Sequence, residues 1–186
     1  MELLPTLELR WLNGWIFILI FYSVFGILLK ILPKEAVIRL YDEEGWTKFQ
    51  KVMAKTSKVF GILIIILQIF TPLKIESLEF IIGVIIFSLG TFGFIISILN
   101  FRDAPLDKPV TSGLYRISRN PQMIMLDLVG VGISITIGSG MTIILIIFGQ
   151  SFSHFRIQGE EKRLLEQYGD LYREYMKKVP RYFLFF

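Results

Sequence analysis

The stretch Leu78–Phe101, LEFIIGVIIFSLGTFGFIISILNF, decides the fold class because only one of its residues, Glu79, is charged. An α-helix rises about 1.5 Å per residue, so a helix of this length crosses the roughly 30 Å hydrocarbon core of a bilayer. Four further apolar blocks accompany it: Trp15–Leu32, Val59–Leu73, Met123–Ile137 and Met141–Phe155. We therefore predict an all-α, polytopic integral membrane protein with about five transmembrane helices.

The last two blocks predict a short helical hairpin over residues 123–155. They are separated by Gly138-Ser139-Gly140, a sequence typical of a tight turn. A helix over either block is short for a full crossing, so the hairpin either spans a thin region or extends into the interface. Val59–Leu73 is equally short, but the polar-faced stretch before it is able to continue the same helix.

The lysine and arginine residues predict the orientation. With five spans, residues 1–14 and 71–77 share one side and hold two basic residues, Arg10 and Lys74. The other side holds the remaining 18 of the 20 basic residues. Basic residues accumulate in cytoplasmic loops. We therefore expect the N-terminus outside, and the C-terminus and any active site on the cytoplasmic side.

Composition excludes several classes of site. The chain has no cysteine and one histidine, which excludes disulfides, cysteine nucleophiles and thiolate metal sites and leaves no basis for a histidine-rich metal site. The basic residues flank apolar spans, so nothing predicts nucleic-acid binding. No glycine-rich fingerprint of the G-x-G-x-x-G type follows a strand, so no Rossmann nucleotide site is expected. We therefore predict that the protein binds neither a metal nor nucleic acid, and that its surroundings are membrane lipids.

One membrane domain is expected, in two parts: N-terminal membrane helices over residues 1–101 and a candidate catalytic region over 102–186. Asn100–Asn120 is rich in proline and glycine and predicts an irregular loop, a kind of segment that is often functional. Gly159–Val179 predicts one amphipathic cytoplasmic helix with a tyrosine-rich face. Asp127 and His154 are polar residues inside apolar blocks, where they are either functional or hydrogen-bonded within the bundle.

Five short motifs occur in one order over residues 110–181. They are Val110-Thr-Ser-Gly113 with Leu114-Tyr115, Arg119-Asn-Pro121, Glu160-Glu161, Tyr168-Gly169 with Tyr172 and Tyr175, and Val179-Pro180. In this order and spacing the region resembles the isoprenylcysteine carboxyl methyltransferase family, within the wider group that includes phospholipid methyltransferases. Residues 1–75 match that family only in being membranous.

The resemblance implies a membrane methyltransferase that uses S-adenosylmethionine and releases S-adenosylhomocysteine. It implies a carboxylate acceptor on a lipophilic molecule, such as a prenylated cysteine, which enters from the bilayer. Arg119 and Glu161 are the candidate catalytic residues: a guanidinium offers two donors to a carboxylate, and Glu161 would position the arginine or the cofactor. The candidate cofactor-binding residues are Val110, Leu114, Tyr115, Asn120, Pro121, Met123, Glu160, Tyr172 and Pro180.

Two positions depart from the family pattern, which has histidine at Asn120 and tyrosine at Met123. An asparagine is able to replace a hydrogen-bonding histidine but not one that transfers protons. Three alternatives stay open, of which the two departures motivate the last. They are N-methylation of a phospholipid or another amine with Glu161 as the base, reduction by an NADPH-dependent membrane reductase, and an inactive protein of the same fold.

Overall fold

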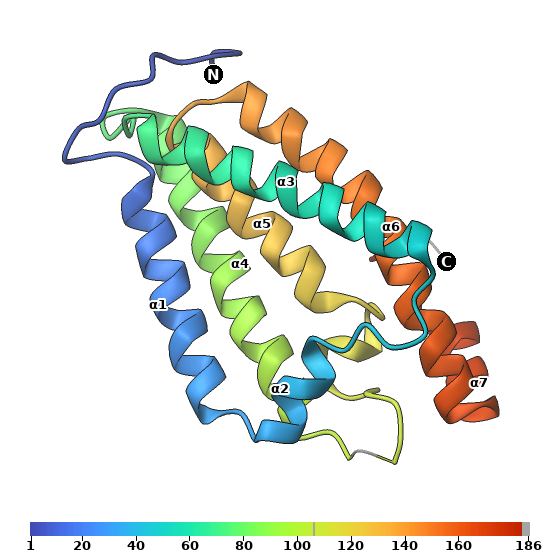
Figure 1. Ribbon diagram of the computed structural model, residues 1–186. Helices are drawn as coiled ribbons and strands as arrows, with labels where there is room; N and C mark the ends of the chain where they lie inside the picture. The colour runs from blue at the N-terminus through green and yellow to red at the C-terminus, as the bar shows by residue number, and fades with distance from the viewer. Residues whose placement is uncertain (106, 184–186) are drawn as a thin grey trace.

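The computed structural model describes residues 1–105 and 107–183, and within them the chain is α-helical. Its elements are α1 (Trp15–Ile31), α2 (Lys34–Leu40), α3 (Lys48–Phe70), α4 (Leu78–Arg102), the single 3₁₀ turn η1 (Gly113–Arg116), α5 (Pro121–Thr136), α6 (Gly140–Tyr168) and α7 (Asp170–Lys178). Figure 1 shows α1, α3, α4, α5 and α6 as a bundle, with α2 and α7 gathered at one end. The prediction of an all-α fold is confirmed.

The five long helices coincide with the five apolar blocks. Among the described residues, α3, α4 and α6 are long and apolar enough to cross a membrane, and α1 and α5 are shorter apolar helices. α3 starts at Lys48, so the polar-faced stretch before Val59 does continue the same helix. The 16 residues of α5 rise about 24 Å, whereas α6 has 29 residues and extends past the apolar part of the hairpin.

Glycine lets α4 and α5 pack closely at the centre of the bundle. A methyl group at Gly83 would lie 2.6 Å from the backbone nitrogen of Thr136, and one at Gly90 would lie 2.7 Å from that of Val129. Both distances are shorter than real carbon–nitrogen contacts. α4 and α5 also form the most extensive helix pair in the structure, and this pair leads the chain into and out of the 103–120 loop.

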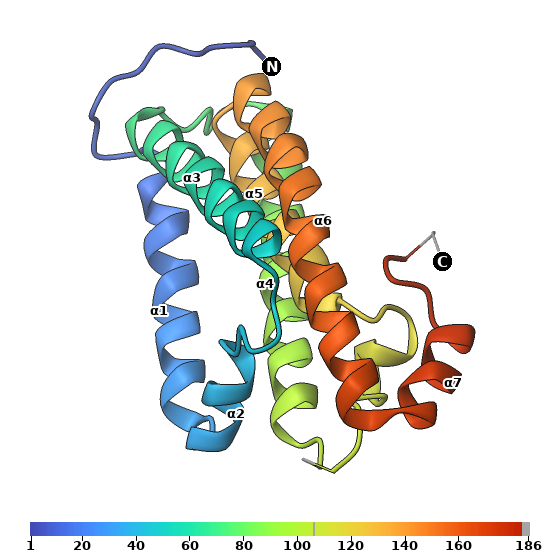
Figure 2. The same ribbon diagram turned by 45° about the vertical axis from the view of Figure 1, so that its right-hand side comes forward.

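The connections between helices fall at the two ends of the bundle as the five-span prediction requires. The N–H of Glu2 donates to the carbonyl of Gly138 at 2.8 Å, and that of Lys74 donates to the carbonyl of Thr136 at 2.9 Å. The N-terminal segment, the α3–α4 connection and the α5–α6 turn therefore share one end. The α1–α3 connection and the 103–120 loop lie at the other end, with α7 (Figures 1 and 2).

One predicted element is wrong: Gly159–Val179 is not a single helix. α6 runs without interruption from the membrane hairpin through Gly159 to Tyr168. Glycine at position 159 serves packing, because a side chain there would lie 3.0 Å from Gln50 of α3. The break comes instead at Gly169, whose φ of 53° and ψ of −124° suit glycine alone among the residues. α7 then turns back beside the end of α6 (Figure 2).

Candidate functional site

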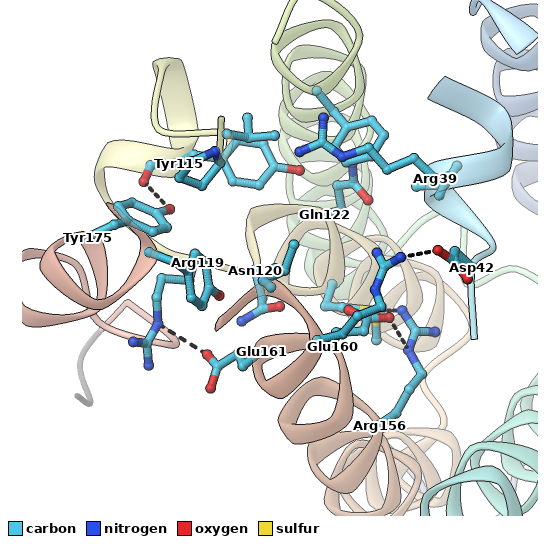
Figure 3. Close-up of a pocket in the computed structure, with 18 residues that line it drawn as sticks. Arg39, Asp42, Tyr115, Arg119, Asn120, Gln122, Arg156, Glu160, Glu161 and Tyr175 are labelled. Atoms are coloured by element: carbon cyan, nitrogen blue, oxygen red, sulfur yellow. Dashed lines mark hydrogen bonds and ion pairs between the residues drawn. The ribbon is translucent and has the colours of Figure 1, made fainter. Parts of the chain in front are cut away.

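A polar cavity lies at the end of the bundle where α2, the 103–120 loop, α5, α6 and α7 meet. Figure 3 shows its charged and aromatic side chains converging from these elements. It collects most of the predicted site residues: Val110, Tyr115, Arg119, Asn120, Met123, Glu160, Glu161 and Tyr172. Leu114, Pro121 and Pro180 do not line it.

The loop that forms one wall is held by side chains of α4 and α7, which bind its backbone. Gly113 has a φ of 56°, and a side chain at that position would run into Asn100, whose Oδ1 accepts the N–H of Leu114 at 3.0 Å. The hydroxyl of Tyr175 donates to the carbonyl of Tyr115 at 2.6 Å, which ties α7 to the loop (Figure 3). The predicted residue Leu114 thus holds the loop through its backbone.

Glu161 lies between two arginines. Its Oε1 is 3.1 Å from Nε of Arg119, and both side chains are only 5% exposed. The geometry of that contact is an ion pair rather than an aligned hydrogen bond. Its Oε2 accepts from Nη2 and Nε of Arg181, at 2.6 and 3.0 Å. Both oxygens of Glu161 are therefore occupied, and the two predicted catalytic residues are in direct contact.

The tail after α7 folds over the Arg119-Asn-Pro121 motif. The N–H of Arg119 donates to the carbonyl of Pro180 at 3.0 Å, and Nδ2 of Asn120 donates to that of Arg181 at 3.2 Å. The hydroxyl of Ser118 donates to the same Arg181 carbonyl at 3.0 Å. Asn120 thus holds the tail as a hydrogen-bond donor, a task that a histidine is equally able to perform.

Two further ion pairs line the opposite wall. Nε of Arg156 lies 3.1 Å from Oε1 of Glu160, one turn along α6. Arg163 pairs with Asp42, in the connection after α2. The second pair joins α6 to an N-terminal segment that the motifs do not include.

The tyrosines of the cavity stay protonated at neutral pH. Burial raises the pKa of Tyr115, and it also raises that of Tyr172 and that of Tyr175, because the phenolate would lose its hydration. All three therefore present neutral hydroxyls and aromatic faces.

Sequence reasoning missed several residues of the site. Arg181 follows directly on the Val179-Pro180 motif, and Tyr175 was part of a motif and of the aromatic face but was not predicted as a site residue. Arg39 and Asp42 come from α2 and its following loop, far from any motif. Proximity to the motif was a usable signal for Arg181, but none existed for Arg39 or Asp42, because only tertiary packing brings α2 to the site.

Two less polar cavities adjoin the site, and Met123 lines all three. One lies among α1, α3, α5 and α6 and includes Asp127. The other lies beside α2 and includes Phe25 and Phe94. His154 is hydrogen-bonded within the protein: its ring nitrogens lie 3.0 Å from the hydroxyl of Tyr182 and from Nε2 of Gln158.

Comparison with known families matches residues 56–171 to the phospholipid methyltransferase family. That range covers more than half of the chain and includes every motif up to Leu171. The chain belongs to the phospholipid methyltransferase family. A search of curated proteins and a search of solved structures each found no match.

Membership of this family makes the chain a membrane methyltransferase that uses S-adenosylmethionine. The matched range begins inside α3, so α1, α2 and the start of α3 lie outside it.

Proposed function

We propose that this protein transfers a methyl group from S-adenosylmethionine to the carboxylate of a lipophilic acceptor, such as a prenylated cysteine. The observation that carries the choice of acceptor is the cavity's charge. Its lining holds four guanidiniums, from Arg39, Arg119, Arg156 and Arg163, against three carboxylates. A lining with surplus positive charge favours an anionic acceptor.

The residues of the cavity suit the cofactor. A sulfonium is attracted by aromatic faces and carboxylates, and Tyr115, Tyr172 and Glu160 line the cavity. We propose Val110, Tyr115, Asn120, Met123, Glu160 and Tyr172 as the residues around the cofactor, with Leu114, Pro121 and Pro180 shaping that wall through the backbone.

Bound S-adenosylmethionine supplies a methyl group that leaves sulfur for a carboxylate oxygen, giving a neutral thioether and an ester. A carboxylate is ionised at pH 7, so this transfer needs alignment and exclusion of water rather than a base. We propose that the charge of Arg119 orients the acceptor carboxylate. Glu161 is proposed to position Arg119, and Arg181 and the tail to close that side of the cavity.

The occupied oxygens of Glu161 argue against a role as a general base. Taking up a proton there would weaken contacts to two guanidiniums, at 3.1 and 2.6 Å. The second candidate function is N-methylation of a phospholipid amine, which the name of the family favours. In that reaction Glu160 is the better base, because Arg156 is its one ion-pair partner among the described residues.

The site is proposed to face the cytoplasm, with the acceptor entering from the bilayer. Support comes from the excess of basic residues at this end of the bundle. A water-soluble cofactor reaches the site from that side, and the two less polar cavities that share Met123 extend toward the membrane helices.

The test is transfer of labelled methyl from S-adenosylmethionine by the purified protein in lipid nanodiscs. N-acetyl-S-farnesylcysteine and dioleoylphosphatidylethanolamine are offered separately as acceptors. We expect label in the farnesylcysteine product that mild alkali releases as methanol, because an ester is hydrolysed and a methylamine is not. Alkali-stable label on the phospholipid alone would replace the first proposal with the second.

A further inference from the structure

Arg39 is the one guanidinium in the lining that has no carboxylate partner within residues 1–105 and 107–183. The other three are paired: Arg119 with Glu161, Arg156 with Glu160, and Arg163 with Asp42. Among the side chains that line the cavity, the surplus positive charge is therefore located on Arg39 of α2.

The side chain of Arg39 is held with its donors facing the cavity. It is half-buried, and its Cζ lies 5.0 Å from the centre of the Phe101 ring on α4. Figure 3 shows Arg39 reaching from α2 toward Tyr115 and Gln122. An aromatic face restrains the plane of a guanidinium and leaves the N–H groups at its edge free to donate.

Gln122 supplies a second donor to the same space. Its Nε2 is buried and makes no well-aligned hydrogen bond within the described residues, although the hydroxyl of Tyr115 lies close enough to interact with the amide. Buried donors are nearly always paired in folded proteins, so one that faces a cavity indicates a ligand oxygen. A guanidinium and a carboxamide together suit an anion with several oxygens.

A second cavity, with a mixed lining of charged and apolar side chains, adjoins these donors. The cavity beside α2 shares Leu40, Gln122 and Met123 with the polar cavity. Its far wall includes Phe25, Phe94 and Ile98. A lipophilic molecule lying in it would bring a charged end to Arg39.

We propose that Arg39 and Gln122 bind the anionic group of the lipophilic acceptor, a carboxylate or a phosphate, so that α2 selects the class of acceptor. This inference rests on the proposed function. In carboxyl methylation, Arg39 would hold the carboxylate from α2 while Arg119 acts from the loop. Because the family match begins at residue 56, this specificity element lies outside the part of the chain that the family shares.

The test separates acceptor binding from cofactor binding. Arg39→Gln is compared with Lys34→Gln, which removes one charge from an exposed position on the same helix. At saturating S-adenosylmethionine, we expect Arg39→Gln to raise the KM for N-acetyl-S-farnesylcysteine at least about tenfold, with Arg39→Lys partly restoring it. The Kd for S-adenosylhomocysteine should stay unchanged, and Lys34→Gln should change neither constant.

An uncharged competitor provides a readout that a folding defect would not reproduce. The amide of N-acetyl-S-farnesylcysteine should inhibit wild type and Arg39→Gln with the same Ki. An unchanged acceptor KM would overturn the inference. A rise confined to the Kd for S-adenosylhomocysteine would also overturn the inference, because it would show that Arg39 binds the carboxylate of the cofactor rather than that of the acceptor. Failure of the wild-type protein to transfer methyl to any acceptor would instead refute the proposed function.

Discussion

Arg119 and Glu161 form the residue-level centre of the site, and their burial makes the contact sensitive to small changes. Arg119 also donates from Nη1 to the carbonyl of Met176 at 3.4 Å, so its guanidinium touches both α6 and α7. A lysine has the same charge but one compact ammonium, which is unable to reproduce two contacts from a planar group. We therefore expect the identity of residue 119 to matter more than its charge.

For Arg119→Lys we predict methyl transfer at least about tenfold slower than wild type, equal to roughly 1.4 kcal/mol in the barrier. The measurement is the initial rate at saturating cofactor and acceptor. Arg116→Lys is the matched control, because Arg116 is exposed on the neighbouring η1 turn. Equal rates for Arg119→Lys and the control would remove Arg119 from the mechanism.

Glu161→Gln should destabilise the fold, since it leaves the Arg119 and Arg181 guanidiniums without their shared carboxylate. Removing one partner of a buried ion pair costs about 3–5 kcal/mol. We expect a lower midpoint of thermal unfolding in detergent. Glu166→Gln, at an exposed position where the glutamate lies 3.8 Å from Lys162, should change stability by less than about 1 kcal/mol. A midpoint for Glu161→Gln as high as that control would show that the pair contributes little.

The sequence predicted some of these residues and missed others for a physical reason. Arg119 and Glu161 were found because each belongs to a short motif, and the structure brings them together. Arg181 and Arg39 were missed because an arginine beside a membrane span is normally an orientation signal. Only the folded chain distinguishes an anchoring arginine from one that faces a cavity.

At the scale of the helix, the apolar blocks predicted the position of each long element but not every boundary. α5 begins at Pro121, a residue that favours the first position of a helix. α3 begins after Thr47, which forms a capping box with Gln50. The α6–α7 break was mispredicted because Gly159 and Gly169 look alike in sequence. Gly159 serves packing against α3, whereas Gly169 adopts a positive φ.

Close packing of α4 on α5 yields a prediction at this scale. Gly90→Ala should lower the midpoint of thermal unfolding, because the added methyl group would lie 2.7 Å from the backbone nitrogen of Val129. Gly26→Ala on α1 is the matched control: nothing lies within 4 Å of the added group, so no loss is expected. Equal midpoints for the two variants would contradict the packing described for this helix pair.

At the scale of the whole molecule, successive connections between helices lie at alternate ends of the bundle, as predicted. Which end faces the cytoplasm stays a prediction. The chain has no cysteine, so single cysteines report topology without background. Glu76→Cys and Ser112→Cys are suitable because both positions are exposed and lie at opposite ends of the bundle. Ser77 is less suitable because its hydroxyl caps α4.

In intact cells, we expect Glu76→Cys to react with a membrane-impermeant maleimide and Ser112→Cys to react only after permeabilisation. The physical reason is the distribution of basic residues, 18 at one end against two at the other. Labelling of Ser112→Cys in intact cells, with Glu76→Cys protected, would place the candidate site on the outer side.

Cofactor binding by the purified protein is the measurement that tests the central claim most directly. Titration calorimetry and thermal unfolding in detergent would compare S-adenosylhomocysteine with NADPH, since a ligand of the native state raises its stability. We predict that S-adenosylhomocysteine binds and raises the unfolding midpoint, and that NADPH does neither. Asn120→His should retain binding, because histidine is also able to donate to the Arg181 carbonyl. Stabilisation by NADPH, or by neither ligand in a folded sample, would contradict the account.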